Sequence, residues 1–239
     1  MKRNMQHSAL LSPSYKKFFL EIVRRMLLET SLFSSRHPDV LKLDLWNEVG
    51  DKEKDFTNHI NDIFEPNSMT YIELDKDLCE KYRRLGTGNR VANSSISSMK
   101  LPYDKFDILL DISTSDHLED EKFEKAIKEY HRVLKTGGIL VMLHDNAEFL
   151  TFSMFKEDIP EFGFFPRSVA HIRKSLESNG FEILKMRMAF SVFMIYMPNI
   201  ILKMFTSIPV KRFISKVEYR IGNSILSRSI IVIAQKKQC

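Results

Sequence analysis

The chain switches repeatedly between apolar residues at helical spacing and short apolar runs, and this order predicts alternating helices and strands. An amphipathic helix is predicted first, at 14–30, with Pro13 suited to its first turn. Apolar runs then predict seven strands, at 40–46, 69–75, 89–96, 106–114, 138–144, 181–193 and 228–237. Helical periodicity between the strands predicts helices at 76–85, 118–135 and from 165 to a stop at Asn179 and Gly180.

This alternation indicates an α/β fold with a mostly parallel sheet of seven strands and helices on both faces. Residues 1–38 are predicted to form an N-terminal helical extension and residues 39–239 the α/β domain. Within that domain, 194–224 is predicted as a helical insertion before the last strand. Ligands of such sheets bind beyond the carboxyl ends of the strands, so the residues after each strand are the candidate site.

The net charge of +5 is unevenly distributed along the chain. Residues 39–80 are rich in acids, whereas both ends are rich in Lys and Arg. A basic end can contact the phosphates of lipid or nucleic acid, or form an ordinary solvated surface. The two cysteines suggest no disulfide framework, and the first residues lack the apolar run of a signal peptide. We therefore expect a cytoplasmic protein.

Three segments resemble the small-molecule, type 11-like branch of the class I S-adenosylmethionine-dependent methyltransferases. They read "LPYDKFDILLDISTSDHLED", "EYHRVLKTGGILVM" and "IRKSLESNGFEI". The resemblance covers roughly residues 40–235 and implies a Rossmann-like fold, S-adenosyl-L-methionine as cofactor and methyl transfer as the reaction. The motif at 132–138 marks the fold rather than the chemistry, and Thr136 replaces the family's proline.

The resemblance also assigns residues to the nucleoside part of the cofactor. In the family, an acid that ends the second strand binds the ribose hydroxyls, and Asp75 matches that position. A carboxylate accepts two hydrogen bonds from a diol, but Asp75 is equally suited to cap the following helix. The family's acid for the adenine amino group is replaced here by Ser97, and Met99 beside it can pack on adenine.

The first loop departs most from the family, whose Gly-x-Gly-x-Gly lets the backbone approach the cofactor closely. Asp44, Trp46 and Glu48 stand at the three glycine positions, and Lys42 stands where the family prefers an acid. In one interpretation, Asp44, Asn47 or Glu48 binds the methionine ammonium and Trp46 packs against the ligand. In the other, the cofactor site has decayed and the domain is a scaffold.

Acid–base chemistry is predicted after the fourth and fifth strands. Asp116 and His117 follow the fourth strand, where a histidine can take a proton from a hydroxyl as it is methylated. The alternative is that His117 packs against adenine or caps the next helix. His144 and Asp145 follow the fifth strand and can orient or deprotonate an acceptor, or else order the loop. No cluster of His and Cys has the spacing of metal ligands, so no metal is expected.

The insertion at 194–224 is apolar, rich in methionine and then basic, and it is interrupted before it reaches the length of a bilayer span. Three uses fit: helices that complete the core, a lid or peripheral membrane contact through 194–216, and a homodimer surface. Lys211, Arg212 and Lys216 would lie near lipid phosphates in the membrane interpretation.

Together these features predict a methyltransferase acting on a small molecule, such as a sugar or a lipid-linked glycan hydroxyl. Membrane association would follow from a lipid-linked acceptor. The alternative is a non-catalytic methyltransferase-like domain that acts through a partner. Nucleic acid is not the expected substrate, because the Asn/Asp-Pro-Pro-Tyr/Phe motif typical of base-modifying members is absent after the fourth strand.

Overall fold

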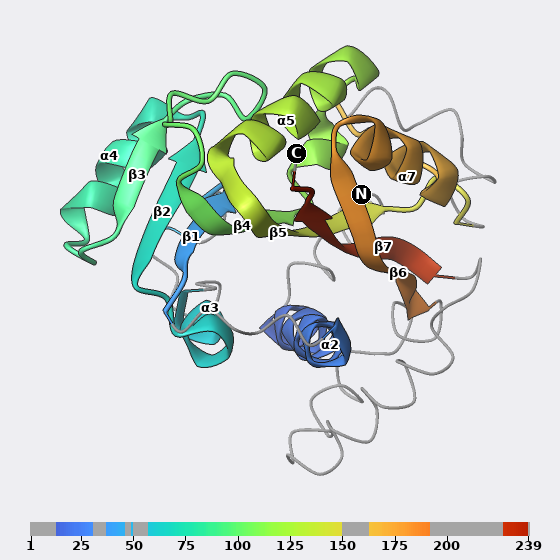
Figure 1. Cartoon of the computed structure of the whole chain (residues 1–239). Helices are drawn as coiled ribbons and strands as arrows, with labels where there is room; N and C mark the ends of the chain where they lie inside the picture. Colours follow the sequence, from blue (N-terminus) through green and yellow to red (C-terminus); the bar gives the residue numbers. More distant parts are fainter. Residues whose placement is uncertain are drawn as a thin grey trace, which may run out of the picture.

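The computed structural model describes residues 13–30, 37–45, 49, 57–149, 163–191 and 227–238. Within these residues, seven strands form one sheet in the order β3-β2-β1-β4-β5-β7-β6 (Figure 1). Their bounds are β1 (Asp39–Leu43), β2 (Ser68–Glu73), β3 (Arg90–Asn93), β4 (Phe106–Ile112), β5 (Leu134–Asp145), β6 (Phe181–Ser191) and β7 (Ser227–Lys236). β7 runs antiparallel to β5 and β6, and the pairs among β1 to β5 are parallel, so the predicted mostly parallel α/β fold is confirmed.

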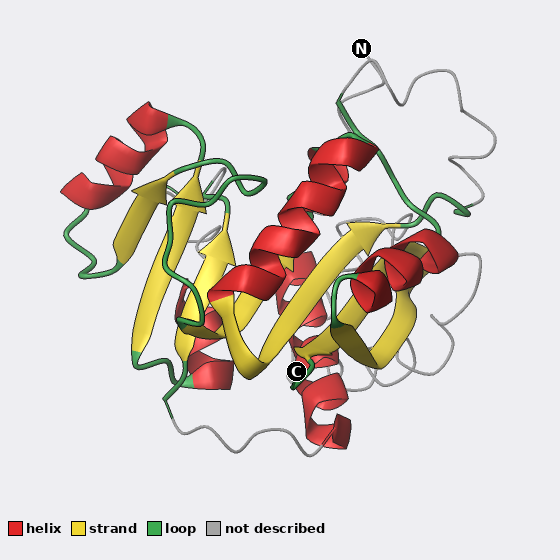
Figure 2. Cartoon of the chain, turned by 45° about the horizontal axis from the view of Figure 1, so that its top comes forward, coloured by secondary structure: helices red, strands yellow, loops and turns green. Residues whose placement is uncertain are grey.

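Helices cover both faces of this sheet, as Figures 1 and 2 show. The helices are α2 (Pro13–Thr30), α3 (Thr57–Phe64), α4 (Lys76–Arg84), α5 (Asp120–Val133) and α7 (Val169–Ser178), with a short 3-10 turn, η1 (Ser115–His117). α2 and α3 lie on one face, and α5 and α7 lie on the other. None of the described helices is both long and apolar enough to cross a bilayer.

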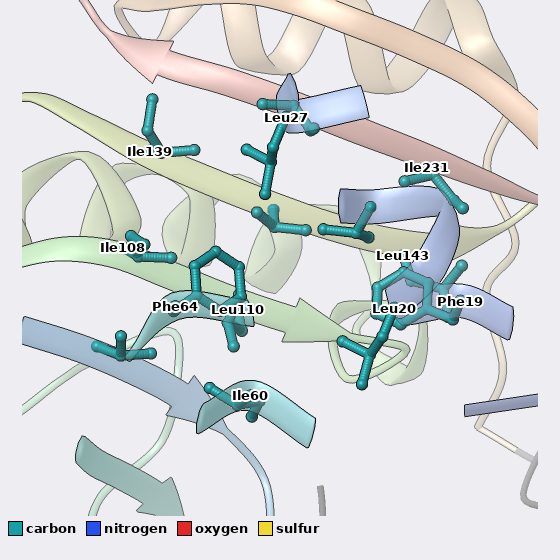
Figure 3. Close-up of a cluster of buried hydrophobic side chains, with 14 of the residues drawn as sticks. Phe19, Leu20, Leu27, Ile60, Phe64, Ile108, Leu110, Ile139, Leu143 and Ile231 are labelled. Atoms are coloured by element: carbon teal, nitrogen blue, oxygen red, sulfur yellow. The ribbon is translucent and has the colours of Figure 1, made fainter. Parts of the chain in front are cut away.

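The N-terminal helix is integrated into the core of the sheet. Phe19, Leu20 and Leu27 of α2 lie in one buried cluster with side chains from α3, β4, β5 and β7 (Figure 3). Each such side chain contributes about 2 kcal/mol when it is fully removed from water. The helix is therefore held by the same apolar contacts that hold the strands, and the division at residue 38 stays a prediction about the sequence.

The opposite face is filled by the apolar stripes of α5 and α7. Phe123, Ile127 and Tyr130 of α5 and Ile172 and Leu176 of α7 are fully buried against the strands. This stripe is the one that the helical period predicts.

The start of β5 and the presence of helix α3 differ most from the sequence prediction. β5 begins at Leu134 rather than at residue 138, because Gly137 and Gly138 lie in an irregular part of the strand where its register with β4 shifts. Gly137 has a φ of 78°, which glycine adopts without strain. α3 was not predicted, and the predicted insertion at 194–224 lies outside the described residues.

The parallel strands place their carboxyl ends at one edge of the sheet. β1 ends before Asp44, β2 at Glu73, β4 before Ser113 and β5 at Asp145. The side chains at this edge form the candidate site.

Candidate functional site

The turn after β1 begins with a residue in a conformation that favours glycine, and that residue is Asp44. Asp44 has a φ of 68°, in the left-handed region that glycine favours and that aspartate tolerates better than most residues. Its amide donates to Ile72 O at 2.8 Å, which fixes the turn to β2. The backbone at Asp44 therefore has a conformation that favours glycine. The three residues Trp46, Asn47 and Glu48 lie outside the described residues, and their cofactor roles stay predictions.

Lys42, on β1, is a buried lysine whose side chain lies against the backbone of this turn. Its Nζ donates to Leu43 O at 3.3 Å and to Asp44 O at 2.7 Å, and it lies 5.8 Å from the centre of the Tyr71 ring. The side chain is 2 % exposed. The lysine therefore stabilises the turn by donating hydrogen bonds to two of its carbonyl oxygens.

The acid that ends β2 is Glu73, not the Asp75 that sequence matching selected. Glu73 Oε2 accepts from Leu45 N at 2.9 Å and Oε1 accepts from Asp75 N at 2.8 Å. Burial raises the pKa of Glu73, against the effect of these two amides, and the neighbouring Asp44 raises it further. The next residue, Leu74, is 72 % exposed and can pack against a ligand at this edge.

Asp75 caps helix α4. Its Oδ1 accepts from Asp77 N at 2.8 Å and from Leu78 N at 3.2 Å, and its backbone has the extended conformation of an N-cap residue. This is the alternative role that its sequence context allowed. The side chain is exposed, and its Oδ2 accepts no hydrogen bond from the part of the chain that the structure describes, so capping and ligand binding are compatible.

After β3, serines form a local turn. Ser94 Oγ donates to Ser98 O at 2.9 Å, and the hydroxyls of Ser95 and Ser97 lie 2.9 Å apart. Ser97 stays half-buried at this edge. Met99, in contrast, is buried: it is 6 % exposed and belongs to the apolar cluster that packs against α5. It therefore packs in the core rather than on an adenine. An apolar residue after a strand suits either role, and sequence alone does not separate them.

The turn after β4 holds a buried carboxyl group beside an exposed imidazole. Asp116 is fully buried, and its Oδ2 accepts from the Ser113 hydroxyl at 2.6 Å. Its Oδ1 has no hydrogen-bond partner within the described part of the chain and lies 3.9 Å from His117 Nε2. Burial, followed by the charge of Asp145, raises the pKa of Asp116 to about 7.

The orientation of His117 defines its tautomer. Its Nδ1 lies 3.0 Å from Gly163 O, and because a carbonyl oxygen only accepts, Nδ1 carries the proton. Nε2 is then the basic nitrogen, and it is the one that faces Asp116. The ring also packs on Phe164 at 5.9 Å, while 45 % of the side chain is exposed. The predicted pair of Asp116 and His117 is thus brought together.

Asp145, the last residue of β5, forms a buried ion pair with Arg228. Asp145 Oδ2 accepts from Arg228 Nη2 at 3.3 Å, and Oδ1 accepts from Ser229 Oγ at 3.0 Å. The pair is buried, with 6 % of the Arg228 side chain and 3 % of the Asp145 side chain exposed. Both oxygens of Asp145 are engaged, so it is a structural ion-pair partner and not a free base for an acceptor. It acts on the site through its charge, which raises the pKa of Asp116.

His144 is likewise committed to the interior. Burial lowers its pKa to about 4, and its Nε2 accepts from Arg167 Nη1 at 3.2 Å. Arg167 also donates to Ser115 O, Leu118 O and Asp120 Oδ1. This arginine was not identified from the sequence, because its partners lie on the β4–α5 connection, far along the chain. It holds the turn that carries Asp116 and His117 in place.

Comparisons with known proteins agree with this geometry. The methyltransferase domain family matches residues 48–142. The fold is similar to that of a SAM-dependent methyltransferase from Archaeoglobus fulgidus, at 17% identity and a TM-score of 0.56, over 91% of this chain and 94% of that one. No curated protein matches the chain in sequence.

Two other solved structures share the fold. The geranyl diphosphate C-methyltransferase from Streptomyces coelicolor, in complex with Mg²⁺, geranyl diphosphate and S-adenosyl-L-homocysteine, is 10% identical, with a TM-score of 0.58 over 90% of this chain and 80% of that one. The cyclase SpnF is 17% identical, with a TM-score of 0.60 over 91% and 80%. Residues 48–142 therefore match the methyltransferase domain family, and the chain has the Rossmann-like fold that these solved methyltransferases share.

Proposed function

We propose that the protein is an S-adenosylmethionine-dependent methyltransferase whose acceptor is the hydroxyl group of a small molecule, such as a sugar or a lipid-linked glycan. One observation carries the proposal: acids at the ends of β1 and β2 share an edge of the sheet with the Asp116–His117 pair after β4. The acids at the ends of β1 and β2 can accept hydrogen bonds from a nucleoside cofactor. The Asp116–His117 pair can remove a proton from an acceptor.

Asp44, Glu73 and Asp75 are the residues that would hold the cofactor, with Ser97 near its adenine. Carboxylates at strand ends accept hydrogen bonds from a ribose diol and attract a positively charged ligand. When bound, S-adenosylmethionine supplies a methyl group already activated by its sulfonium. Much of the rate can then come from positioning the acceptor, and the protein's chemical task is to manage one proton.

His117 is the residue that would take this proton. Its Nδ1–H is held by Gly163 O, so Nε2 accepts the hydroxyl proton as the acceptor oxygen is methylated. Above about pH 7, where Asp116 is ionised, its carboxylate lies 3.9 Å away and stabilises the resulting positive ring. Since Asp145 is engaged by Arg228 and Ser229, it takes no part in this transfer.

The first test is calorimetric titration of the purified protein with S-adenosylmethionine and S-adenosylhomocysteine. Micromolar binding of either ligand supports the proposal. Glu73→Gln should weaken binding, whereas Asp77→Asn, which removes an exposed acid one turn away, should leave it unchanged. A folded protein that binds neither ligand would overturn the proposal.

Acceptors can then be screened by the formation of S-adenosylhomocysteine with free and lipid-linked sugars. His117→Gln should lower turnover while cofactor affinity stays at the wild-type value. Loss of cofactor binding in this variant would instead indicate that His117 packs against the cofactor.

The second candidate is a non-catalytic domain that acts through a partner. Asp44, at the first glycine position, favours this second candidate, because its side chain leaves less room for a cofactor to approach the backbone. The occurrence of this fold in a cyclase also means that the fold alone does not fix the reaction. The titration described above separates the two candidates.

A further inference from the structure

Residues 163–167, the strap, contact the turn between β4 and α5 before the chain enters α7. At one end the strap is bonded to the exit of β5, where Arg167 N donates to Asp145 O at 3.1 Å. In its middle, Phe165 N donates to Asp116 O at 2.6 Å. The strap therefore joins the exits of β4 and β5 through backbone hydrogen bonds.

The Arg167 side chain extends from the strap to the turn that carries His117. Its Nη1 donates to Ser115 O at 3.4 Å, and its Nη2 donates to Leu118 O at 2.6 Å. These two carbonyl groups lie on either side of His117 in the sequence. The guanidinium also lies over the Phe123 ring, 3.9 Å from its centre, and 2 % of the side chain is exposed. Because the donors of a guanidinium form a rigid planar fork, one buried side chain fixes the turn on both sides of the histidine.

The two ring nitrogens of His117 have unequal partners. Nδ1 lies 3.0 Å from Gly163 O, at the start of the strap. Nε2 lies 3.9 Å from Asp116 Oδ1, which is beyond hydrogen-bond distance. A proton on Nδ1 therefore gains a hydrogen bond that a proton on Nε2 does not, and such bonds decide which nitrogen of a neutral imidazole is protonated.

We propose that the strap selects Nε2 of His117 as the nitrogen that reacts, with Arg167 as the positioning residue. Arg167 holds the turn against the strap, and Gly163 O then accepts the Nδ1 proton. Nε2 keeps its lone pair, which can accept the hydroxyl proton of the acceptor. This inference rests on the proposed function for the source of that proton.

The test is an NMR measurement of the histidine tautomer, on protein carrying isotope-labelled histidine. Long-range proton–nitrogen correlation spectra show which ring nitrogen carries the proton, and the signals of His117 are those lost in His117→Gln. At about pH 8, where an ordinary imidazole is neutral, wild-type His117 should carry its proton on Nδ1. Arg167→Met, which removes every donor of this side chain, should show a mixture of both tautomers. Arg173→Met, which removes a half-exposed arginine of α7, is the matched control and should keep the wild-type spectrum.

A second variant changes the strap without altering the buried arginine. Gly163 is exposed and has a φ of 60°, and a Cβ added there would meet no heavy atom within 4 Å. Alanine is strained at this φ, so Gly163→Ala should displace the carbonyl group from Nδ1 while the core stays intact. Gly86→Ala is the matched control, because Gly86 has a φ of 63° and equally open surroundings. It should leave the His117 spectrum unchanged.

Two results would overturn the positioning role. One is a wild-type His117 protonated on Nε2, and the other is an unchanged His117 spectrum in folded Arg167→Met. If Arg167→Met does not fold, Gly163→Ala decides in its place, and an unchanged spectrum in that variant overturns the role. A change of equal size in either control also overturns it, because the effect would then not come from the strap.

The spectra are recorded without cofactor, so they are independent of the proposed function. A protein that shows the expected spectra and binds no cofactor loses the proposed function and keeps the oriented imidazole. Once an acceptor is found, Gly163→Ala should lower kcat by about tenfold or more, because a general base contributes about 10²–10⁴-fold to the rate. Cofactor affinity should stay at the wild-type value. An unchanged kcat in a variant with altered tautomers would show that the strap does not select the reacting nitrogen.

Discussion

Replacing Asp116 by Asn should make the protein more stable above neutral pH. Asp116 is fully buried, Oδ2 has the Ser113 hydroxyl as partner, and Oδ1 has no hydrogen bond among the described residues. Its pKa is raised from 3.8 to about 7, chiefly by burial. The unfolded chain, in contrast, ionises near the ordinary value of about 3.9.

The sign follows from these two values. Between them the folded protein binds a proton that the unfolded chain has lost, so stability falls as pH rises towards about 7. The difference between the folded and unfolded pKa of Asp116 corresponds to about 4 kcal/mol of unfolding free energy. About 3 kcal/mol of this is lost between about pH 5 and about pH 7. Asparagine keeps the shape of the side chain and the acceptor for the Ser113 hydroxyl but carries no charge. The free energy of unfolding of Asp116→Asn should therefore not fall in this way as pH rises.

Chemical denaturation at about pH 5 and about pH 8 would measure the effect. The advantage of Asp116→Asn over the wild type should grow by about 3 kcal/mol between these two conditions. Glu121→Gln is the matched control, because Glu121 is exposed and should change the profile little. Parallel profiles for the wild type and Asp116→Asn would refute the reasoning. If the stabilised variant also loses turnover, Asp116 is a functional group kept at a cost in stability.

Three further predictions follow from the same edge of the sheet. Asp44→Gly should raise the free energy of unfolding by about 1 kcal/mol, because glycine adopts the left-handed φ of 68° without strain; an unchanged value in denaturation would contradict this. Arg228→Met should cost about 3–5 kcal/mol by leaving Asp145 buried and unpaired, and the double variant with Asp145→Leu should recover most of the loss; equal losses in both would argue against the ion pair as the cause. Asp75→Ala should cost about 1 kcal/mol through the lost cap, whereas Asp75→Ser should keep stability. Weaker cofactor binding by the serine variant would assign Asp75 a ligand role beyond capping.

The apolar pattern was sufficient to locate the seven strands, although it does not give their order in the sheet. Each of the seven strands coincides with a predicted apolar run, because strands buried on both faces carry few polar residues. The pattern failed for α3 (Thr57–Phe64), which is eight residues long, so its helical period is too short to distinguish from a loop. The carboxyl ends of the predicted strands were also displaced, by one to three residues, and the candidate site depends on those ends.

The choice between Glu73 and Asp75 shows this dependence. Both acids follow the same apolar run, and the extra residues assigned to the strand moved the expected ligand from Glu73 to the helix cap. Recognising Asp75 as the N-cap of the helix that begins at Lys76 would have ended the strand earlier.

Asp145 was misjudged for a different reason. Its partner, Arg228, is on β7, and nothing in the local sequence of either residue indicates that the two strands are neighbours. Contacts between distant segments set the charge environment of a site, and a single sequence does not show them.

The pairing of β6 with β7 has a consequence for how this fold can be altered. Ser191 and Ser227 are register partners, so the chain leaves the sheet and rejoins it at adjacent points. The entropy of closing a loop between two fixed points grows only slowly with its length. The closure entropy between these two points therefore changes little with the length of the segment that joins them. This position is a natural junction for chimeras, in which the corresponding segment of a protein with the same fold is transplanted and the change in ligand binding is measured.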